Sequence, residues 1–219
     1  MSARPWALCC LLTAAILTAY AGSPEPARLH LFLHGDAPPA SEFKALKTEL
    51  TSLLREANID VDWEYSAKRR SVDGFLVVVD LEGDCAVRSR AEAPPGPDGA
   101  SLGSTAVANG HVQPFTSIDC AALSGMLTPR IAAQPAALRS WLYGRAMARV
   151  LAHEVYHYIG QATDHLKSGV AREKFSAADL LQERFEFDDL ALSRLRNIHS
   201  ANNEPANTGR LVNTLTAGQ

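Results

Sequence analysis

The residues with the clearest chemical potential are two histidines and a glutamate in the segment H-E-V-Y-H at positions 153–157. On an α-helix of 3.6 residues per turn, His153 and His157 point to the same side, so their imidazoles could hold one Zn²⁺ ion together. Glu154 could face a water bound to that ion and act as general base. The alternative is a chance match on an ordinary buried helix, expected in about one in a hundred chains of this length. We therefore predict a metal site on this helix.

The same stretch resembles the metzincin clan of zinc peptidases, whose motif is H-E-x-x-H-x-x-G-x-x-H. Four positions of that motif are matched, by His153, Glu154, His157 and Gly160. In the clan, the glycine turns the chain so that a third histidine reaches the metal. The equivalent position here is Thr163, and a histidine follows two residues later. The resemblance therefore implies His165 as the third ligand, reached through a slightly longer loop.

Two other arrangements of the third ligand stay open. Asp164 is the next candidate, as in relatives that use an aspartate; otherwise it would orient a ligand or bind solvent as a neighbour of the metal site. The second arrangement resembles the gluzincin group, which takes an acidic ligand from a later helix. Asp179 and Glu183 lie at the start of such a helix in this chain.

The metzincin resemblance implies a secreted or periplasmic zinc-dependent endopeptidase acting on peptide or protein substrates. One catalytic Zn²⁺ would polarise the scissile carbonyl and activate a bound water. Glu154 would take the proton of that water and pass it to the leaving amine. A different class of function is a catalytically inactive, metal-stabilised extracellular binding module, and a third is a globular protein with a coincidental motif. Glu154 argues against the binding module, because a structural metal site needs no base.

The order of the expected elements also resembles that of the metzincins: a twisted mixed sheet with a covering helix, an edge strand over the cleft, and then the metal-binding helix. The resemblance implies an α+β, zincin-like fold with a small helical C-terminal lobe. The edge strand would bind extended substrate by strand addition, through Gly103, Ser104, Thr105 and Ala106. The chain departs from the clan in having no methionine after Met147, and no tyrosine after Tyr158 to stabilise an oxyanion. The metal itself would carry that stabilisation.

The elements that must position this site begin with a predicted β-α-β-β order. Residues 28–34 are apolar enough for a buried strand, and residues 59–65 alternate as in a half-exposed strand. Between them, Ser41 is a typical N-cap for an amphipathic helix that continues to about Ala57. The run at 75–81 has no polar side, which predicts a central strand covered on both faces.

Extended structure is predicted for residues 102–120, upstream of the metal-binding helix. The Asn109-Gly110 step favours a tight turn. Pro114 cannot donate a hydrogen bond to a neighbouring strand, which places this region at a sheet edge. A short helical turn is expected at 121–126.

The metal-binding helix is predicted to span 135–160, because proline suits a first helical turn and the glycine at the end accepts a positive φ. Ser176 and Asp179 have the spacing of a capping box for a second amphipathic helix, which would run to about Leu195. Residues 197–219 are polar and lack periodicity, so a disordered tail is expected.

The N-terminus has the features of a signal peptide over residues 1–21. Arg4 supplies the basic region, residues 6–20 form a short apolar run, and A-Y-A at 19–21 is similar to an A-x-A cleavage site. The apolar run is too short for a comfortable membrane span. We expect cleavage after Ala21 and export, with a retained anchor as the alternative.

Cleavage would leave two cysteines, Cys85 and Cys120, of the four in the chain. In an oxidising compartment an isolated pair is expected to form one disulfide. The alternative is two buried free thiols. A zinc role is not expected for them, because they lie far upstream of the histidines and lack C-x-x-C spacing.

Composition sets the outer limits of these predictions. The chain has 219 residues, 47% of them hydrophobic and 21% charged, with a formal net charge of -3. This suits an N-terminal zincin-like lobe over 22–160, which includes the metal-binding helix, and a C-terminal lobe over 161–196 that carries the third ligand. The charge does not favour nucleic acid or an anionic membrane as a partner. A monomer without a stable membrane span is expected after cleavage.

Overall fold

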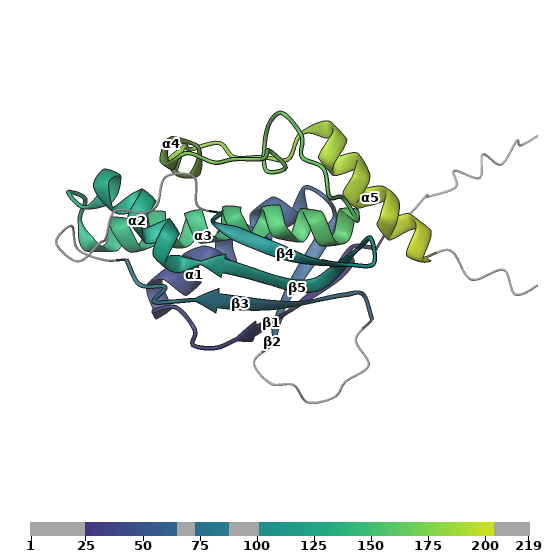
Figure 1. The fold of residues 1–219 in the computed structure, drawn as a ribbon, viewed down its shortest axis with the longest axis horizontal. Helices are drawn as coiled ribbons and strands as arrows, with labels where there is room; N and C mark the ends of the chain where they lie inside the picture. Colours follow the sequence, from purple (N-terminus) through teal and green to yellow (C-terminus); the bar gives the residue numbers. More distant parts are fainter. Residues whose placement is uncertain (1–24, 65–72, 88–100, 204–219) are drawn as a thin grey trace, which may run out of the picture.

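The structure of the chain is a computed structural model that describes residues 25–64, 73–87 and 101–203. The predicted signal peptide, residues 1–21, and most of the predicted tail lie outside the described residues. Within the described part, no helix is both long and apolar enough to cross a membrane. The described residues form a sheet with helices on one side of it and a helical segment at the C-terminal end (Figure 1).

A five-stranded mixed sheet is the central layer. Its strands in chain order are β1 (Ala27–His34), β2 (Ile59–Glu64), β3 (Phe75–Glu82), β4 (Gly103–Ala108) and β5 (His111–Asp119). In space they lie in the order β2-β1-β3-β5-β4, and all neighbours are parallel except β4 and β5, which are antiparallel. The predicted α+β class with a mixed sheet is therefore confirmed.

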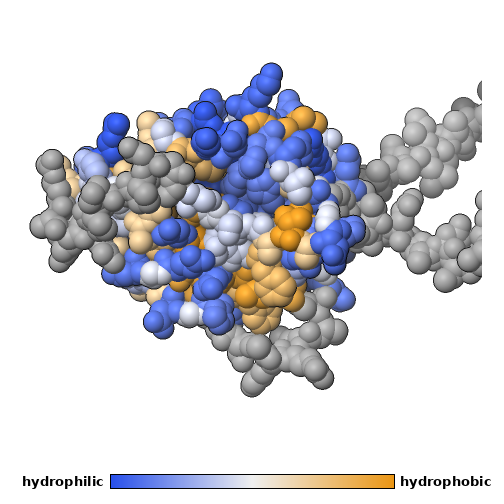
Figure 2. Space-filling view, viewed as in Figure 1, coloured by the Kyte–Doolittle hydropathy of each residue, from blue (hydrophilic) through white to orange (hydrophobic). Residues whose placement is uncertain are grey.

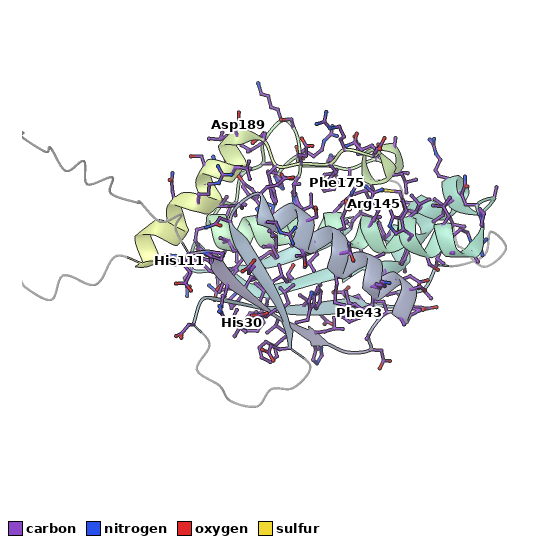
Figure 3. The ribbon with its side chains drawn as sticks, turned by 180° about the vertical axis from the view of Figure 1, so that it is seen from behind. His30, Phe43, His111, Arg145, Phe175 and Asp189 are labelled. Atoms are coloured by element: carbon purple, nitrogen blue, oxygen red, sulfur yellow. A yellow bond between two sulfur atoms is a disulfide. The ribbon has the colours of Figure 1, made fainter. Side chains whose placement is uncertain are left out.

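The helices in chain order are α1 (Ala40–Arg55), α2 (Cys120–Ile131), α3 (Ala136–Gly160), α4 (Ala177–Leu181) and α5 (Asp189–Asn203). Helices α1 and α3 pack against each other on the same face of the sheet, which is seen from behind in Figure 3. The core between them and the sheet is apolar, since alternate strand residues point to one face. Its fully buried members include Leu29, Leu31, Val79, Leu46 and Leu50.

Strand β3 is central, as predicted, but the expectation that both of its faces are covered was wrong. Val77 and Val79 are buried towards the helices, whereas Val78 and Asp80 on the other face are only half-buried. Helices α1 and α3 cover only one face of the sheet, so Val78 on the other face is apolar without being fully buried.

The start of α1 also differs from the prediction, because its N-cap is Pro39 rather than Ser41. Ser41 lies in the first turn and donates its hydroxyl to the Glu42 carboxylate. The carbonyl of Pro39 accepts the Phe43 N–H at 2.9 Å, so the helix begins earlier than the hydroxyl suggested.

The hairpin of β4 and β5 turns at Asn109 and Gly110, both with positive φ (52° and 79°), as the sequence predicted. Strand β4 is the edge strand, but the prediction that Pro114 marks an edge was wrong, because β5 lies between β3 and β4. Pairing of β5 with β3 begins only at Phe115, and the register with β4 shifts after Thr105. Pro114 therefore lies at an irregularity, where a missing N–H is tolerated.

Three helical predictions need correction. The short turn at 121–126 is a twelve-residue helix, α2. The single helix predicted from Ser176 to Leu195 is two helices, α4 and α5, although the capping box of Ser176 and Asp179 is present. Helix α5 continues to residue 203, into the segment predicted to be a disordered tail. The break after α4 occurs where the guanidinium of Arg149 donates to the carbonyls of Leu180 and Gln182.

The predicted disulfide between Cys85 and Cys120 is present. It links the segment after β3 to the first residue of α2, and both cysteines are buried. The carbonyl of Cys120 also accepts the hydroxyl of Tyr143 from α3 at 3.0 Å. The bridge therefore fixes the approach of α2 to the sheet next to the helix that carries the histidines.

Replacing both cysteines by alanine should lower the free energy of unfolding by about 3–4 kcal/mol, because the bridge closes a loop with a sequence separation of 35. Urea unfolding of the oxidised protein and of the Cys85→Ala/Cys120→Ala variant measures the difference. Wild-type protein under reducing conditions is the matched control and should resemble the variant. Equal unfolding midpoints for all three samples would contradict a stabilising bridge.

Candidate metal centre

Every residue of α3 from Tyr143 to His157 is buried. Close packing is possible because Gly144 faces α1: a side-chain carbon there would collide with the carbonyl of Glu42 and the side chain of Ala45. On the opposite side, the segment that follows α3 folds back over it (Figure 1). The histidines of α3 are therefore held between elements that are distant in sequence.

Three histidines converge at this helix, as predicted. One ring nitrogen each from His153, His157 and His165 lies within 4.8 Å of the other two. The Nε2 atoms of His153 and His157 are 3.0 Å apart. His153 and His157 are 6% and 9% exposed, whereas His165 is exposed on the loop after α3. The cluster is thus open to solvent on one side.

The other nitrogen of each helical histidine is held by a backbone carbonyl. Nδ1 of His153 donates to the carbonyl of Val170 at 2.8 Å, and Nδ1 of His157 donates to that of Ala162 at 2.6 Å. A carbonyl can only accept, so in the neutral rings the proton belongs to Nδ1 and the Nε2 lone pair is free. Two such lone pairs face each other at 3.0 Å, an arrangement that a cation between them would relieve.

Burial keeps these imidazoles neutral. Desolvation lowers the pKa of His153 to about 4, against the opposing effect of its bond to the Val170 carbonyl. Desolvation likewise lowers the pKa of His157, and its bond to the Ala162 carbonyl opposes this shift. Neutral imidazole is the form that binds a metal, so both rings are ready as ligands at neutral pH.

The carboxylate of Glu154 lies beside the cluster and is also buried, at 5% exposure. Its Oε2 accepts a hydrogen bond from the hydroxyl of Thr105 on β4 at 2.7 Å. Desolvation raises the pKa of Glu154 to about 7, and the bond from Thr105 opposes the shift. A carboxyl with a pKa near neutrality can both accept and release a proton at physiological pH.

The turn after α3 returns the chain to the histidines, but its left-handed residue was predicted wrongly. Gly160 is the last helical residue, and Gln161 adopts the positive φ, 44°. The amide side chain of Gln161 bonds to the backbone of Val112 on β5, which holds this unusual conformation in place. The N–H of Ala162 then closes the helix on the carbonyl of His157 at 3.1 Å.

The structure does not bring the alternative acidic ligands into the histidine cluster. Asp164 is exposed and accepts two hydrogen bonds from Arg194 of α5, both at 3.0 Å. The same guanidinium donates to the hydroxyl of Tyr156 on α3, so Asp164 ties the loop to α5. Asp179 caps α4 and pairs with Arg172. Glu183 is exposed and is not part of the group of histidines.

A cleft of about 490 Å³ contains the three histidines and Glu154. Strand β4 forms one wall of the cleft through Gly103, Ser104, Thr105 and Val107, and Phe175 also lines it. Ala106 of the predicted substrate strand lies outside this lining, on the outer face. Figure 2 shows the face of the β4–β5 hairpin, where hydrophobic side chains lie beside a weakly polar band; Val107 and Phe115 are more than half exposed.

Several residues of the site were not predicted from sequence. The Thr105–Glu154 bond and the carbonyls of Val170 and Ala162 depend on the placement of segments far apart in the chain. Phe175 lies just before the predicted capping box, and its ring meets that of His153 edge-on, with centroids 5.4 Å apart. Only Thr105 could have been identified from the sequence as a neighbour of the site. It is two residues from Gly103 in the predicted strand, so both residues lie on the same face of that strand.

Comparison with protein-family models, with curated proteins and with solved structures finds no match for this chain. The function proposed below therefore stands on the geometry of the site.

Glu154→Gln should stabilise the metal-free protein at pH 8 and have little effect at pH 4.5. The folded pKa of about 7 exceeds the usual carboxyl value of 4.5, so the folded state binds more protons between these pH values. The contribution of Glu154 to stability is therefore lost as pH rises through this window. Above pH 7 the buried charge should cost roughly 3 kcal/mol, which glutamine avoids.

Urea unfolding in the presence of a chelator, at pH 4.5 and pH 8, measures this difference. Both proteins keep the same histidines, so the histidine contribution cancels in the comparison. Glu183→Gln, at an exposed carboxylate, is the matched control for the loss of one negative charge. A Glu154→Gln effect that does not depend on pH would contradict a buried, destabilised carboxylate.

Proposed function

We propose that this protein is a zincin-like, zinc-dependent endopeptidase in which His153, His157 and His165 hold one Zn²⁺ and Glu154 is the general base. The observation that carries the proposal is the convergence of three imidazole nitrogens within 4.8 Å, in a cleft that also contains a buried carboxylate. Structural zinc sites are usually closed by four protein ligands, whereas catalytic sites keep three and leave a position open. Three histidines open to a cleft fit the catalytic pattern.

The donor set suits Zn²⁺. Neutral imidazole is a common zinc ligand, and the carbonyls of Val170 and Ala162 fix the tautomer and the orientation of two of the rings. When bound, Zn²⁺ supplies Lewis acidity that makes water more acidic and polarises a carbonyl oxygen.

Glu154 supplies the proton chemistry. Thr105 occupies Oε2 of its carboxylate, so we assign the uptake of a proton from the attacking water to Oε1. The same carboxyl then delivers this proton to the amine that leaves. Burial excludes bulk water from the carboxylate, which favours transfer to a group in the cleft.

The substrate assigned to this site is an extended peptide or protein segment. Strand β4 is the edge of the sheet, so the backbone groups on its outer side are available for strand addition. Four of its residues line the cleft that Glu154 also lines. Export to a secreted or periplasmic location is part of the proposal, and the disulfide supports it because such bridges persist in oxidising compartments.

Glu154→Gln should abolish most hydrolysis while zinc is retained. We expect cleavage of an unfolded protein to fall by at least about 100-fold, the scale of a lost general base. Elemental analysis should still find one zinc per chain, because the histidines are unchanged. Glu183→Gln serves as the control and should cleave like wild type.

Two results would redirect the proposal. A Glu154→Gln variant as active as wild type would show that the mechanism is wrong. A wild-type protein that binds zinc but cleaves no peptide would instead favour the metal-stabilised binding module.

His165→Ala should weaken zinc binding by at least about 100-fold. Losing a residue that only orients a ligand already costs about 10- to 100-fold in affinity, and the loss of a direct ligand should cost more. Competition with a chromophoric chelator measures the affinity. Asp179→Ala and Glu183→Ala should leave the affinity within a few-fold of wild type, because these carboxylates lie outside the cluster. The reverse pattern would favour the gluzincin-like arrangement with an acidic ligand from α4 or the segment after it.

A further inference from the structure

We propose that Thr105 is a positioning residue that, together with Gly103, seats the carboxylate of Glu154 against the edge strand β4. This inference rests on the endopeptidase function proposed above. It assigns a second role to the strand that lines the cleft: besides receiving substrate, β4 fixes the orientation of the base.

The direction of the hydrogen bonds makes the Thr105 hydroxyl a donor to Glu154. The hydroxyl of Thr116 donates to the carbonyl of Ser104 at 2.8 Å, so its proton is not available to Thr105, whose oxygen is 3.2 Å away. An ionised carboxylate carries no proton, so the proton between Thr105 and Glu154 must come from the threonine. The closest acceptor for it is Oε2 of Glu154, at 2.7 Å.

The second carboxylate oxygen is confined by Gly103, which is on the same face of β4 as Thr105. A side-chain carbon on Gly103 would lie 2.8 Å from Oε1 of Glu154 and 3.0 Å from Cγ1 of Val150. Only glycine therefore lets the strand come this close to α3 with the carboxylate between them. Thr105 holds one oxygen by a bond, and Gly103 leaves room for the other.

The side chain of a glutamate has three rotatable bonds, and a helical backbone alone does not fix them in one conformation. Contacts from another element, here Thr105 and Gly103, are needed to hold the carboxylate in place. A base that is displaced by about 1 Å can lose about 100-fold in rate even when substrate still binds. Thr105 and Gly103 lie on the strand that is assigned to substrate binding. A peptide paired with β4 would therefore also restrict the motion of Glu154.

The test compares zinc-loaded wild type with Thr105→Val, which removes the hydroxyl at nearly constant volume, and Thr105→Ser, which keeps it. Thr105→Val should lower kcat roughly ten- to a hundred-fold, the scale of a lost hydrogen bond to a charged group, with KM nearly unchanged. Thr105→Ser should restore most of kcat. Thr48→Val makes the same change at an exposed threonine of α1, outside the cleft, and it should behave like wild type.

Crystal structures of the same zinc-loaded variants give a readout that does not depend on activity. The Glu154 side chain should keep its wild-type conformation in Thr105→Ser and leave it in Thr105→Val, while zinc occupancy stays the same. An unmoved Glu154 in Thr105→Val, or an undiminished kcat, overturns the inference. If Glu154 moves in Thr105→Val but wild type cleaves no peptide, the positioning role of Thr105 is supported and the endopeptidase function is contradicted.

Discussion

The burial of polar side chains on α3 is the constraint on which the rest of the structure depends. Two imidazoles, a carboxylate and two guanidinium groups lie on this helix with little exposure to water. A buried polar group is costly unless it is hydrogen-bonded, so each needs a partner from another part of the chain. Arg145 and Arg149 pair with Glu49 of α1 and bind carbonyls of the segment after α4. The chain after α3 is thus fastened to the helix through its backbone.

The same burial changes the protonation of His153, His157 and Glu154. It disfavours the charged form of the imidazoles, so they remain neutral where free histidine would begin to protonate. It also disfavours the charged form of Glu154, so a carboxylate with a raised pKa stands beside imidazoles with lowered ones. Groups whose environments push their pKa values in opposite directions are typical of catalytic sites, although ion-pair networks can do the same. A divalent cation would reverse the balance by favouring the ionised carboxylate.

Local patterns in the sequence predicted the strands, the long helix, the hairpin turn and the pairing of Cys85 with Cys120, because these depend on nearby residues or on a small choice of partners. Two of the errors have a different cause. The positive φ was predicted at Gly160 but occurs at Gln161, because the Gln161 side chain forms hydrogen bonds with the backbone of Val112 on β5. Likewise, the break after α4 depends on Arg149. Such long-range bonds override local propensity and leave no periodic signal.

The segment between Gly160 and His165 is two residues longer than the corresponding segment of the metzincin motif. The loop that carries His165 begins near Ala162 and ends near Val170, and the carbonyls of these two residues accept the Nδ1 protons of His157 and His153. The loop is therefore held at both ends by the rings of His153 and His157. These are the same two rings that His165, in the middle of the loop, lies beside. Ring orientation and loop position therefore stabilise each other, and the position of His165 is coupled to those of His153 and His157. The length of this loop matters less than the positions of its two carbonyls, because these carbonyls hold the two rings.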